Sequence, residues 1–259
     1  MKTVIAALQH SSPAFQTGAA THVGRVRTRN EDSLLARPEI GLWAVADGMG
    51  GHDAGDLASA TVVDALRSVG RAQSAAHLLA QCERQLAQAN SELVEISHAR
   101  GAMLGTTIAV LLVHGEHFAG VWAGDSRIYL VRDRAITLCS RDHTEAQDLV
   151  AEGHLTQAEA RAWPRRNVIT RAIGVRDAPE LEIANGTLRS GDVFVLCTDG
   201  LTNHVEDHEI LAVAARNTPQ RACDNLIELT LSRGATDNAT VIAVRYQPGS
   251  ASRRRGPWE

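Results

Sequence analysis

The sequence predicts an α+β fold in which antiparallel strands are covered by helices. Short runs rich in Val and Ile are bounded by sharp turns, which is typical of strands. Two of these runs, 107–113 and 118–123, are separated only by His114-Gly115-Glu116-His117, a link typical of a hairpin. The helical segments fall in blocks before and after the strands, so regular βαβ alternation is not expected.

The strands and helices can be placed along the chain from their apolar spacing. Strands are expected at 42–46, 107–113, 118–123, 128–131, 193–197 and 239–245. One long helix is predicted because apolar residues recur at steps of three and four, at Leu78, Cys82, Leu86, Ala89, Leu93 and Ile96. A second helix is predicted to begin at Thr218-Pro219, a cap followed by a first-turn proline, and to end at Gly234.

The sequence predicts a single domain at residues 20–246. A loose lead-in at 1–19 is expected before it, and a loose tail at 247–259 after it. Within the domain, residues 141–180 form a charged helical insertion. Two helix starts are indicated there, by Thr144 with Gln147 and by Thr156 with Glu159. This insertion is interpreted as a lid or substrate-docking element, with a plain surface excursion as the alternative.

Composition excludes several classes of protein. The 259 residues are 44% hydrophobic and carry a formal net charge of −4, which argues against nucleic-acid or membrane-surface partners. The four cysteines form no CxxC pair, as expected in a reducing compartment. The N-terminal apolar run is too short for a signal peptide, and no run approaches the ~20 residues of a membrane span. We therefore expect a cytoplasmic protein.

Four aspartates lie where predicted strands begin or end: Asp47, Asp125, Asp199 and Asp237. A further acidic pair, Glu31-Asp32, lies in the stretch RVRTRNEDS. Each alone is explained as a turn former, because Asp bonds its own following backbone. If the strands are neighbours, however, the carboxylates converge, and they must then be protonated or neutralised by a cation. Oxygen ligands without Cys or His select hard ions such as Mg²⁺, Mn²⁺ or Ca²⁺, and the calcium-loop spacing is absent.

Phosphate chemistry is indicated by what surrounds these acids. A carboxylate shared by two metals ~3.5–4 Å apart is the arrangement used for phosphoryl transfer. Arg27 and Arg29 lie just before Glu31-Asp32, and arginine holds phosphate oxygens bidentately. The glycines after Asp47 allow a close backbone approach to a metal. A solvent-exposed arginine is the alternative for each of the two cations.

These residues resemble the metal-dependent protein phosphatases, or type 2C serine/threonine phosphatases, in their bacterial form. The resemblance covers residues 21–246 and rests on eight motifs in the expected order. They are GRVRTRNEDS, VADGMGGHDAGDLAS, GTTIAVLLV, WAGDSRIYLVRD, RDHT, RRNVITRAIG, GDVFVLCTDGL and TDNATVIAV. Each motif alone is only suggestive, whereas eight in order are specific.

The resemblance implies a four-layer αββα sandwich, with two antiparallel sheets face to face, helices outside and two Mn²⁺ or Mg²⁺ ions at one edge. It implies that Asp47 bridges both ions, that Asp199 and Asp237 complete the first, and that the Gly48 carbonyl binds the second. Glu31 and Asp32 would act through water, Arg27 would hold the phosphate, and Asp125 with Asp199 would form a weaker third site. Residues 141–180 correspond to the family's flap beside the active site.

The mechanism implied is direct attack of a metal-bridging hydroxide on phosphorus, without a phospho-enzyme. Relatives of the eukaryotic kind have a histidine after the Asp-Gly, proposed to protonate the leaving group, and Met49 stands there in this sequence. The acid therefore stays open, with metal-bound water as the default. His52 is interpreted as ordering the glycine loop and His143 as structural. Zinc at His204 and His208 is disfavoured because no third ligand is evident, and Asp207 is interpreted as a helix cap.

The function implied is a phosphatase of phosphoserine and phosphothreonine in proteins. Two alternatives are a catalytically silent phosphoprotein-binding relative and a hydrolase of a small phosphate ester. A silent relative would be expected to lack one of Asp47, Asp199 or Asp237, and all three are present. The implied partners are a cognate bacterial Ser/Thr kinase and its substrates, such as a forkhead-associated-domain protein. The stretch LLARPEIGLWAVADGMGG resembles phosphatases encoded with type VI secretion systems.

Overall fold

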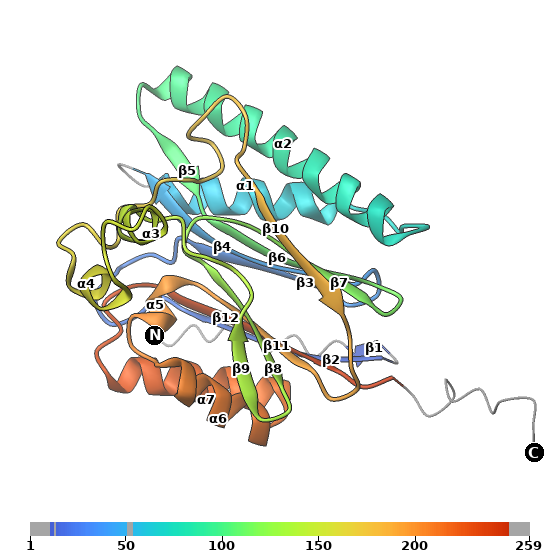
Figure 1. Ribbon diagram of the computed structural model, residues 1–259. Helices are drawn as coiled ribbons and strands as arrows, with labels where there is room; N and C mark the ends of the chain where they lie inside the picture. Colours follow the sequence, from blue (N-terminus) through green and yellow to red (C-terminus); the bar gives the residue numbers. More distant parts are fainter. Residues whose placement is uncertain (1–10, 13, 51–53, 249–259) are drawn as a thin grey trace, which may run out of the picture.

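The structure, a computed structural model, describes residues 11–12, 14–50 and 54–248. Within these residues, strands form two antiparallel sheets (Figure 1). Sheet A has the order β1 (Ser11–Ser12), β2 (Phe15–His22), β12 (Ala239–Tyr246), β11 (Val193–Cys197), β8 (Arg127–Arg132), β9 (Ala135–Leu138). Sheet B has the order β10 (Glu182–Thr187), β7 (His117–Ala123), β6 (Ile108–His114), β4 (Leu42–Gly50), β3 (Asp32–Arg37), and β5 (Leu104–Thr106) also pairs with β4.

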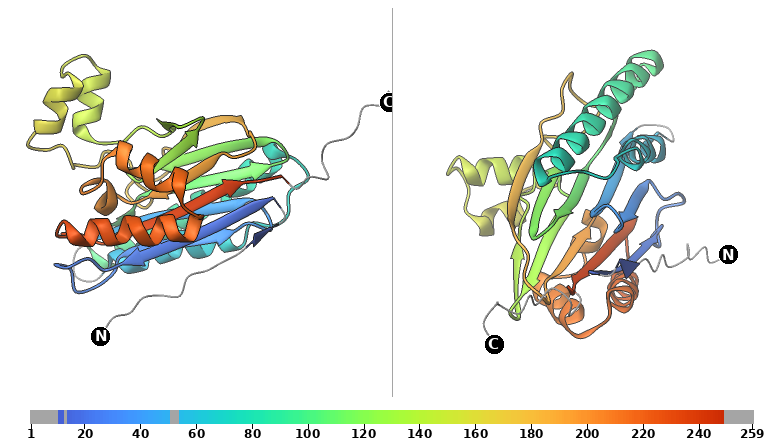
Figure 2. Two further views of the ribbon diagram at one scale, coloured as in Figure 1. Left: turned by 90° about the horizontal axis from the view of Figure 1, so that it is seen from below. Right: turned by 90° about the vertical axis from the view of Figure 1, so that its right-hand side faces the viewer.

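Helices cover the outer face of each sheet, which makes four layers, as predicted (Figure 1). Sheet B is covered by α1 (Gly55–Arg67) and α2 (Ala75–Arg100). Sheet A is covered by α6 (Asp207–Arg216) and α7 (Pro219–Ser232), which follow the single turn α5 (Asp199–Thr202). The short helices α3 (Glu145–Ala151) and α4 (Gln157–Ala162) form the flap, which stands out from the sandwich (Figure 2).

The continuous apolar runs of the central strands follow from burial on both faces. Successive side chains of a strand point to opposite sides. In β4, Leu42 and Ala44 therefore pack beneath α1 and α2, while Trp43 and Val45 pack between the sheets. In β11, Phe194 faces the space between the sheets, and Val195 faces the layer of α6 and α7. Three stacked apolar cores hold the four layers together.

The predicted strands are all present, and β4 is longer than predicted. It continues through Asp47 to Gly50 instead of ending at residue 46. The extension is stabilised because β3 and β5 pair with this part of β4, with Asp32 opposite Asp47 and Thr106 opposite Gly48. Asp47 thus lies inside a strand rather than in the turn that the sequence suggested.

The predicted loose lead-in at 1–19 is wrong for residues 15–19, which belong to β2. This strand pairs with β12 along its whole length, from Phe15 opposite Tyr246 to His22 opposite Ala239. Its small residues concealed it, because a strand rich in Gly and Ala lacks the usual β-branched signal. Those residues are small because α7 packs on them: a Cβ on Gly18 would lie 2.2 Å from the Gln220 nitrogen.

The last described strand, β12, ends at Tyr246, and Gln247 still donates a backbone hydrogen bond to Ala14 O at 2.8 Å. Residues 249–259 of the predicted tail and 1–10 of the predicted lead-in lie outside the described residues. In the flap, Thr156 and Glu159 form the predicted capping box at α4, and Thr144 caps α3 by accepting from the Gln147 nitrogen. None of the helices in the described ranges combines the length and hydropathy that a bilayer span requires.

Candidate active site

Five aspartates that are far apart in the chain meet at one end of the two sheets. Asp47 experiences the negative charge of all the other members of this group, which are Asp32, Asp125, Asp199 and Asp237. Sheet B contributes three of the five through β3, β4 and the end of β7, and sheet A contributes two through the end of β11 and the start of β12. The predicted convergence of carboxylates is therefore present, and we call these five residues the aspartate cluster.

The backbone of Asp47 is fixed by two neighbouring threonines. The Asp47 nitrogen donates to Thr107 Oγ1 at 3.0 Å, and its carbonyl accepts from the Thr107 nitrogen at 2.9 Å and from Thr106 Oγ1 at 2.8 Å. Burial and the negative charge of Asp32 raise the pKa of the Asp47 carboxyl well above its usual range. Asp47 is thus a rigidly placed acid at the centre of the cluster.

Asp32 links the two sheets beneath Asp47. Its Oδ2 accepts hydrogen bonds from Thr198 Oγ1 at 2.9 Å and from Thr240 Oγ1 at 2.7 Å, both on the sheet A side. Burial raises the pKa of Asp32 to about 7 despite these two bonds. Its other oxygen, Oδ1, is buried and has no hydrogen-bond partner among the described residues. That oxygen is a lone acceptor available to a cation or a water.

Asp125 and Asp199 lie on neighbouring segments at the same edge. Burial raises the pKa of Asp125 to about 8, and the nearby charge of Asp199 adds to this effect. Asp199 begins α5, where Asn203 Nδ2 donates to its Oδ2 at 3.1 Å. Burial and the charge of Asp237 also raise the pKa of Asp199. The pair that was predicted for a third metal site is therefore brought together.

The two predicted phosphate ligands lie on the loop before β3. Arg27 Nη2 bonds Asp237 Oδ2 at 2.8 Å, and the Arg27 side chain is 51% exposed. This hydrogen bond raises the pKa of the guanidinium. Asn238 holds the loop, because its Nδ2 donates to Val23 O at 2.9 Å and to Arg29 O at 2.8 Å. The Arg27 side chain thus reaches the aspartate cluster.

Gly48 and Glu31 are placed by close backbone contacts. The Gly48 nitrogen donates to Glu31 O at 3.1 Å. A Cβ on Gly48 would lie 1.9 Å from Gly55 O, so only glycine fits between β4 and the start of α1. The Glu31 carboxyl lies against Gly55, where an added Cβ would meet Glu31 Oε1 at 2.7 Å. His52 and its neighbours at 51 and 53 lie outside the described residues, so the role predicted for His52 is not examined by the structure.

The aspartate cluster fits a hard divalent cation. Its donors are oxygen atoms, one of them the partnerless Oδ1 of Asp32. The negative charges of Asp47 and Asp199 repel each other, and a cation bound between such carboxylates offsets the repulsion. Within the described residues no three acidic, His or Cys side chains are already spaced as ligands of one metal ion.

Comparison with known proteins identifies the family. A family profile described as protein phosphatase 2C matches residues 21–229. The chain belongs to the protein phosphatase 2C family. The serine/threonine protein phosphatase PstP of Mycobacterium tuberculosis is 39% identical over 223 residues, which cover 85% of this chain but 42% of PstP. The chain therefore spans about two fifths of the length of that relative.

Two solved structures share the fold of this protein phosphatase 2C chain. One is described as PppA, a key regulatory component of the T6SS in Pseudomonas aeruginosa, with a TM-score of 0.84, 39% identity and coverage of 90% of this chain and 98% of that chain. The other is the PstP catalytic domain in complex with two manganese ions, with a TM-score of 0.79, 35% identity and coverage of 90% and 99%. The second shows that a relative with this fold holds two metal ions.

His143 supports the aspartate cluster of this family member from behind. Its ring is fully buried and stacks on Trp122 with centroids 6.1 Å apart. Its Nδ1 accepts from the Gly124 nitrogen at 3.2 Å, and its own nitrogen donates to Gly124 O at 2.9 Å. Burial lowers the pKa of His143. These contacts fix the residue before Asp125, which agrees with the structural role that was predicted.

The pair His204 and His208 does not form a metal site with a third ligand among the described residues. His204 Nε2 instead lies 3.3 Å from the Thr236 nitrogen. Asp207 was interpreted as the helix cap here, and this is wrong: Glu206 caps α6 in a capping box with Glu209, while Asp207 is the first helical residue. Asp207 is used differently, since its Oδ1 accepts from the Tyr129 hydroxyl at 2.9 Å.

A polar groove of about 870 Å³ leads away from the aspartate cluster. It begins at Asp125 and Asp199 and runs between the flap and the α5–α6 segment. A smaller cavity of about 340 Å³ lies at the opposite end of β7, where His117 and Phe118 line it among mostly apolar residues. The smaller cavity offers no cluster of charges for a phosphate, so the polar groove is the candidate substrate site.

Sequence reasoning missed the residues that hold the acids in place. Five buried polar residues form hydrogen bonds to an acid of the site or to its backbone: Thr106, Thr107, Thr198, Thr240 and Asn238. The signal that could have found them is a polar residue inside or next to an otherwise apolar strand, because a buried polar group needs a partner.

Proposed function

We propose that this chain is a metal-dependent serine/threonine protein phosphatase, which hydrolyses phosphoserine and phosphothreonine in proteins. The observation that carries the proposal is the aspartate cluster with Arg27 directed at it. Carboxylates that repel one another hold divalent cations, and a nearby arginine holds the remaining phosphate oxygens. The similarity to PstP, a serine/threonine protein phosphatase whose catalytic domain has been solved with two manganese ions, supports the same reaction.

Two Mn²⁺ or Mg²⁺ ions are the proposed cofactors. In this proposal Asp47 would serve both ions, Asp199 and Asp237 would complete the ligands of the first, and the Gly48 carbonyl would contribute to the second. Glu31 and Asp32 would act through water, and Asp125 with Asp199 would hold a weaker third ion. When bound, the ions supply water of lowered pKa and neutralise negative charge on the phosphoryl group.

Arg27 is proposed to change partner between the free and the loaded site. It is bonded to Asp237 in the structure, and Asp237 is one of the proposed metal ligands. With Asp237 serving as a metal ligand, the Arg27 guanidinium would be free to bind two phosphate oxygens in the planar geometry that arginine favours.

The group that protonates the leaving alkoxide is proposed to be water. Met49 stands where some relatives have a histidine, and its side chain cannot donate a proton. Met49 lies near Gly105, where an added Cβ would be 3.6 Å from its terminal carbon. His143 is buried behind the cluster and is bonded to Gly124, so it does not replace the missing acid.

The proposed biological role is reversal of a bacterial Ser/Thr kinase in the cytoplasm, acting on the kinase itself or on a forkhead-associated-domain protein. PppA, described as a T6SS regulator, is 39% identical and supports a role beside a type VI secretion system. Phosphoproteomics of a strain that lacks the gene tests this role. Unchanged phosphorylation at secretion-related sites would reject it.

Phosphate release from a phosphothreonine peptide tests the reaction itself. We expect turnover with Mn²⁺ or Mg²⁺ and none with a chelator. A silent phosphoprotein-binding relative would show no turnover with any metal although the protein is folded, as checked by circular dichroism. A hydrolase of small esters would turn over nucleotides or aryl phosphates far better than phosphopeptides.

A further inference from the structure

The polar groove has two sides of different character. One side is the flap, where Arg161 and Arg166 reach the groove. The other is the α5–α6 segment, where Asn203, Glu206 and Asp207 line it. The flap stands apart from the helices that cover sheet A (Figure 2). A peptide whose phosphorylated residue lies at Asp125 and Asp199 would therefore extend between these two sides.

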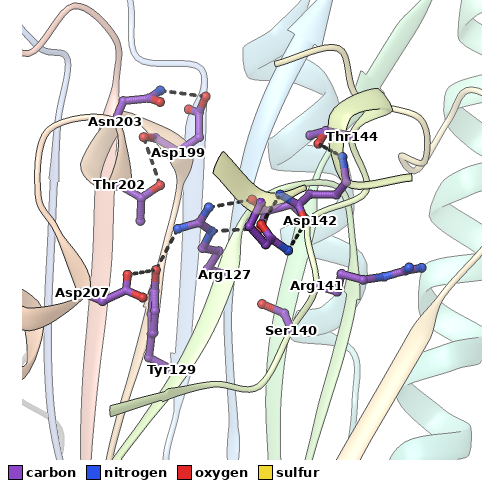
Figure 3. A network of polar contacts seen from close by, with 12 residues as sticks. Arg127, Tyr129, Ser140, Arg141, Asp142, Thr144, Asp199, Thr202, Asn203 and Asp207 are labelled. Carbon is purple, nitrogen blue, oxygen red and sulfur yellow. Dashed lines mark hydrogen bonds and ion pairs between the residues drawn. The ribbon is translucent and has the colours of Figure 1, made fainter. Parts of the chain in front are cut away.

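Both sides of the groove are tied to the sandwich by one hydrogen-bond network (Figure 3). Arg127 of β8 binds Asp142, at the base of the flap, through two bonds of 2.9 and 2.7 Å. Its Nη1 also donates to the Tyr129 hydroxyl at 2.9 Å, and that hydroxyl donates to Asp207 Oδ1 at 2.9 Å. The network holds the flap base and the start of α6 in a fixed relation to β8.

Ion pairs neutralise the other two arginines that line the groove. Arg127 is paired with Asp142, and Arg141 is paired with Glu182 at 3.0 Å. Among the flap arginines, Arg165 is paired with Glu145 at 2.8 Å and does not line the groove.

Arg161 and Arg166 differ from these cations. Both are exposed and line the groove, and within the described part of the chain neither guanidinium has a hydrogen-bond or ion-pair partner. The flap side of the groove therefore presents two uncompensated positive charges that lead away from the aspartate cluster. A guanidinium in this position binds a carboxylate or a phosphate through two parallel bonds.

We propose that Arg161 and Arg166 bind an anionic side chain of the substrate close in sequence to the phosphorylated residue. This inference rests on the proposed phosphatase function and adds a substrate class to it: phosphoproteins with an acidic residue or a second phosphate beside the reacting one. The reacting phosphate itself is assigned to Arg27 and the aspartate cluster, so the two flap arginines bind a different group of the same substrate.

The test compares three sets of phosphothreonine peptides on the full chain with Mn²⁺. The first set has neutral flanks, the second has one Asp at each flanking position in turn, and the third has a second phosphothreonine instead. We expect at least one acidic position to raise kcat/KM about fivefold over the neutral peptide, the gain of an exposed charge pair worth about 1 kcal/mol. The second and third sets distinguish a carboxylate from a phosphate as the bound group.

We define the ratio as kcat/KM for the acidic peptide divided by kcat/KM for the neutral peptide. Arg161→Gln and Arg166→Gln should each reduce this ratio toward one. Arg165→Gln is the matched control, because it removes the same charge from the same flap at a position outside the groove, and it should keep the ratio. A ratio near one in the unaltered protein, or an equal loss in all three variants, overturns the inference. Absence of turnover with every peptide overturns the phosphatase function instead.

Discussion

At the level of single residues, the site contains buried acids whose ionised forms repel one another when no cation is bound. Burial and mutual repulsion raise the pKa values of Asp32, Asp47, Asp125 and Asp199 above the ordinary value. Threonine hydroxyls and backbone groups hold these acids in place, and the protein tolerates the resulting cost because the acids serve a ligand. Two predictions follow from this arrangement.

Asp47→Asn should abolish activity and stabilise the metal-free protein at high pH. A carboxyl whose folded pKa is raised contributes stability below its unfolded pKa of about 3.9, and loses it as pH rises through the folded pKa. The metal-free protein should therefore lose stability as pH rises from about 4 through the raised pKa values of the cluster, which include about 7 for Asp32 and about 8 for Asp125. Asp47→Asn should lose less stability over the same rise in pH, because the substitution removes one buried charge and its repulsion of the other acids.

Urea unfolding with a chelator, at several pH values, measures this difference. Mn²⁺ should raise the stability of the unaltered protein and not that of the variant. Turnover of the variant at saturating Mn²⁺, or an identical pH dependence of the two proteins, would contradict a bridging role for Asp47.

Arg27→Ala should reduce kcat/KM for a phosphopeptide by about 10- to 100-fold, as expected for loss of a charge-assisted bond to phosphate. Mn²⁺ affinity, measured by calorimetry, should not fall, because Asp237 loses a competing partner. Arg25→Ala is the control on the same loop, since Arg25 Nε donates to Leu231 O and not to the cluster. A weaker Mn²⁺ affinity in Arg27→Ala would argue that the arginine acts by holding a metal ligand in place.

At the scale of elements, the flap and α6 depend on β8 for their positions. The Tyr129 hydroxyl is buried between Arg127 and Asp207, and it connects a strand, the start of a helix and, through Arg127, the base of the flap. Removing the buried hydroxyl leaves the polar groups around it without a partner. The elements that meet there are then held less firmly in their relative positions.

Tyr129→Phe should lower the free energy of unfolding by about 1–3 kcal/mol, the cost of leaving buried polar groups unsatisfied. Tyr246→Phe is the matched control, because no hydrogen bond of the Tyr246 hydroxyl is present in the described part of the chain and its change should stay within about 0.5 kcal/mol. Denaturant unfolding compares the two. Equal losses would show that the network does not contribute.

At the scale of the whole molecule, the two sheets are joined by side chains that cross between them. The Trp43 ring of β4 packs on Phe15 of β2 with centroids 5.2 Å apart, and its Nε1 donates to Thr17 Oγ1 at 3.0 Å. Phe118 and Phe194 meet across the same interface at 4.9 Å. The strand that was taken for a loose lead-in is therefore part of the core.

Thr17→Val should destabilise the protein by about 1–3 kcal/mol, because the shape is kept while the buried Trp43 N–H loses its acceptor. Thr137→Val, the same change at an exposed position of β9, should have little effect. Thermal unfolding of both variants measures the difference. A neutral Thr17→Val would show that β2 contributes by packing alone.

Much of the fold was predictable from local patterns. The central strands are buried on both faces, so their sequences are continuous apolar runs. The long helix α2 has one apolar face, which gives the spacing of three and four residues. Strands at the sheet edges were missed: β9 is mostly exposed, and β10 contains Asn185 and Gly186, which usually mark turns. β2 was missed because packing against α7, and not β-propensity, selects its residues.

The family, the acids and Arg27 could be predicted from the sequence, because they lie in recognisable motifs. The residues that support the acids, such as Thr198 and Thr240 on Asp32, become apparent only from tertiary contacts, as do the flap arginines that have no partner among the described residues. Pairing across a groove depends on segments far apart in the chain, so Arg161, Arg165 and Arg166 are indistinguishable in sequence. Their environments differ because Glu145 lies beside only one of them.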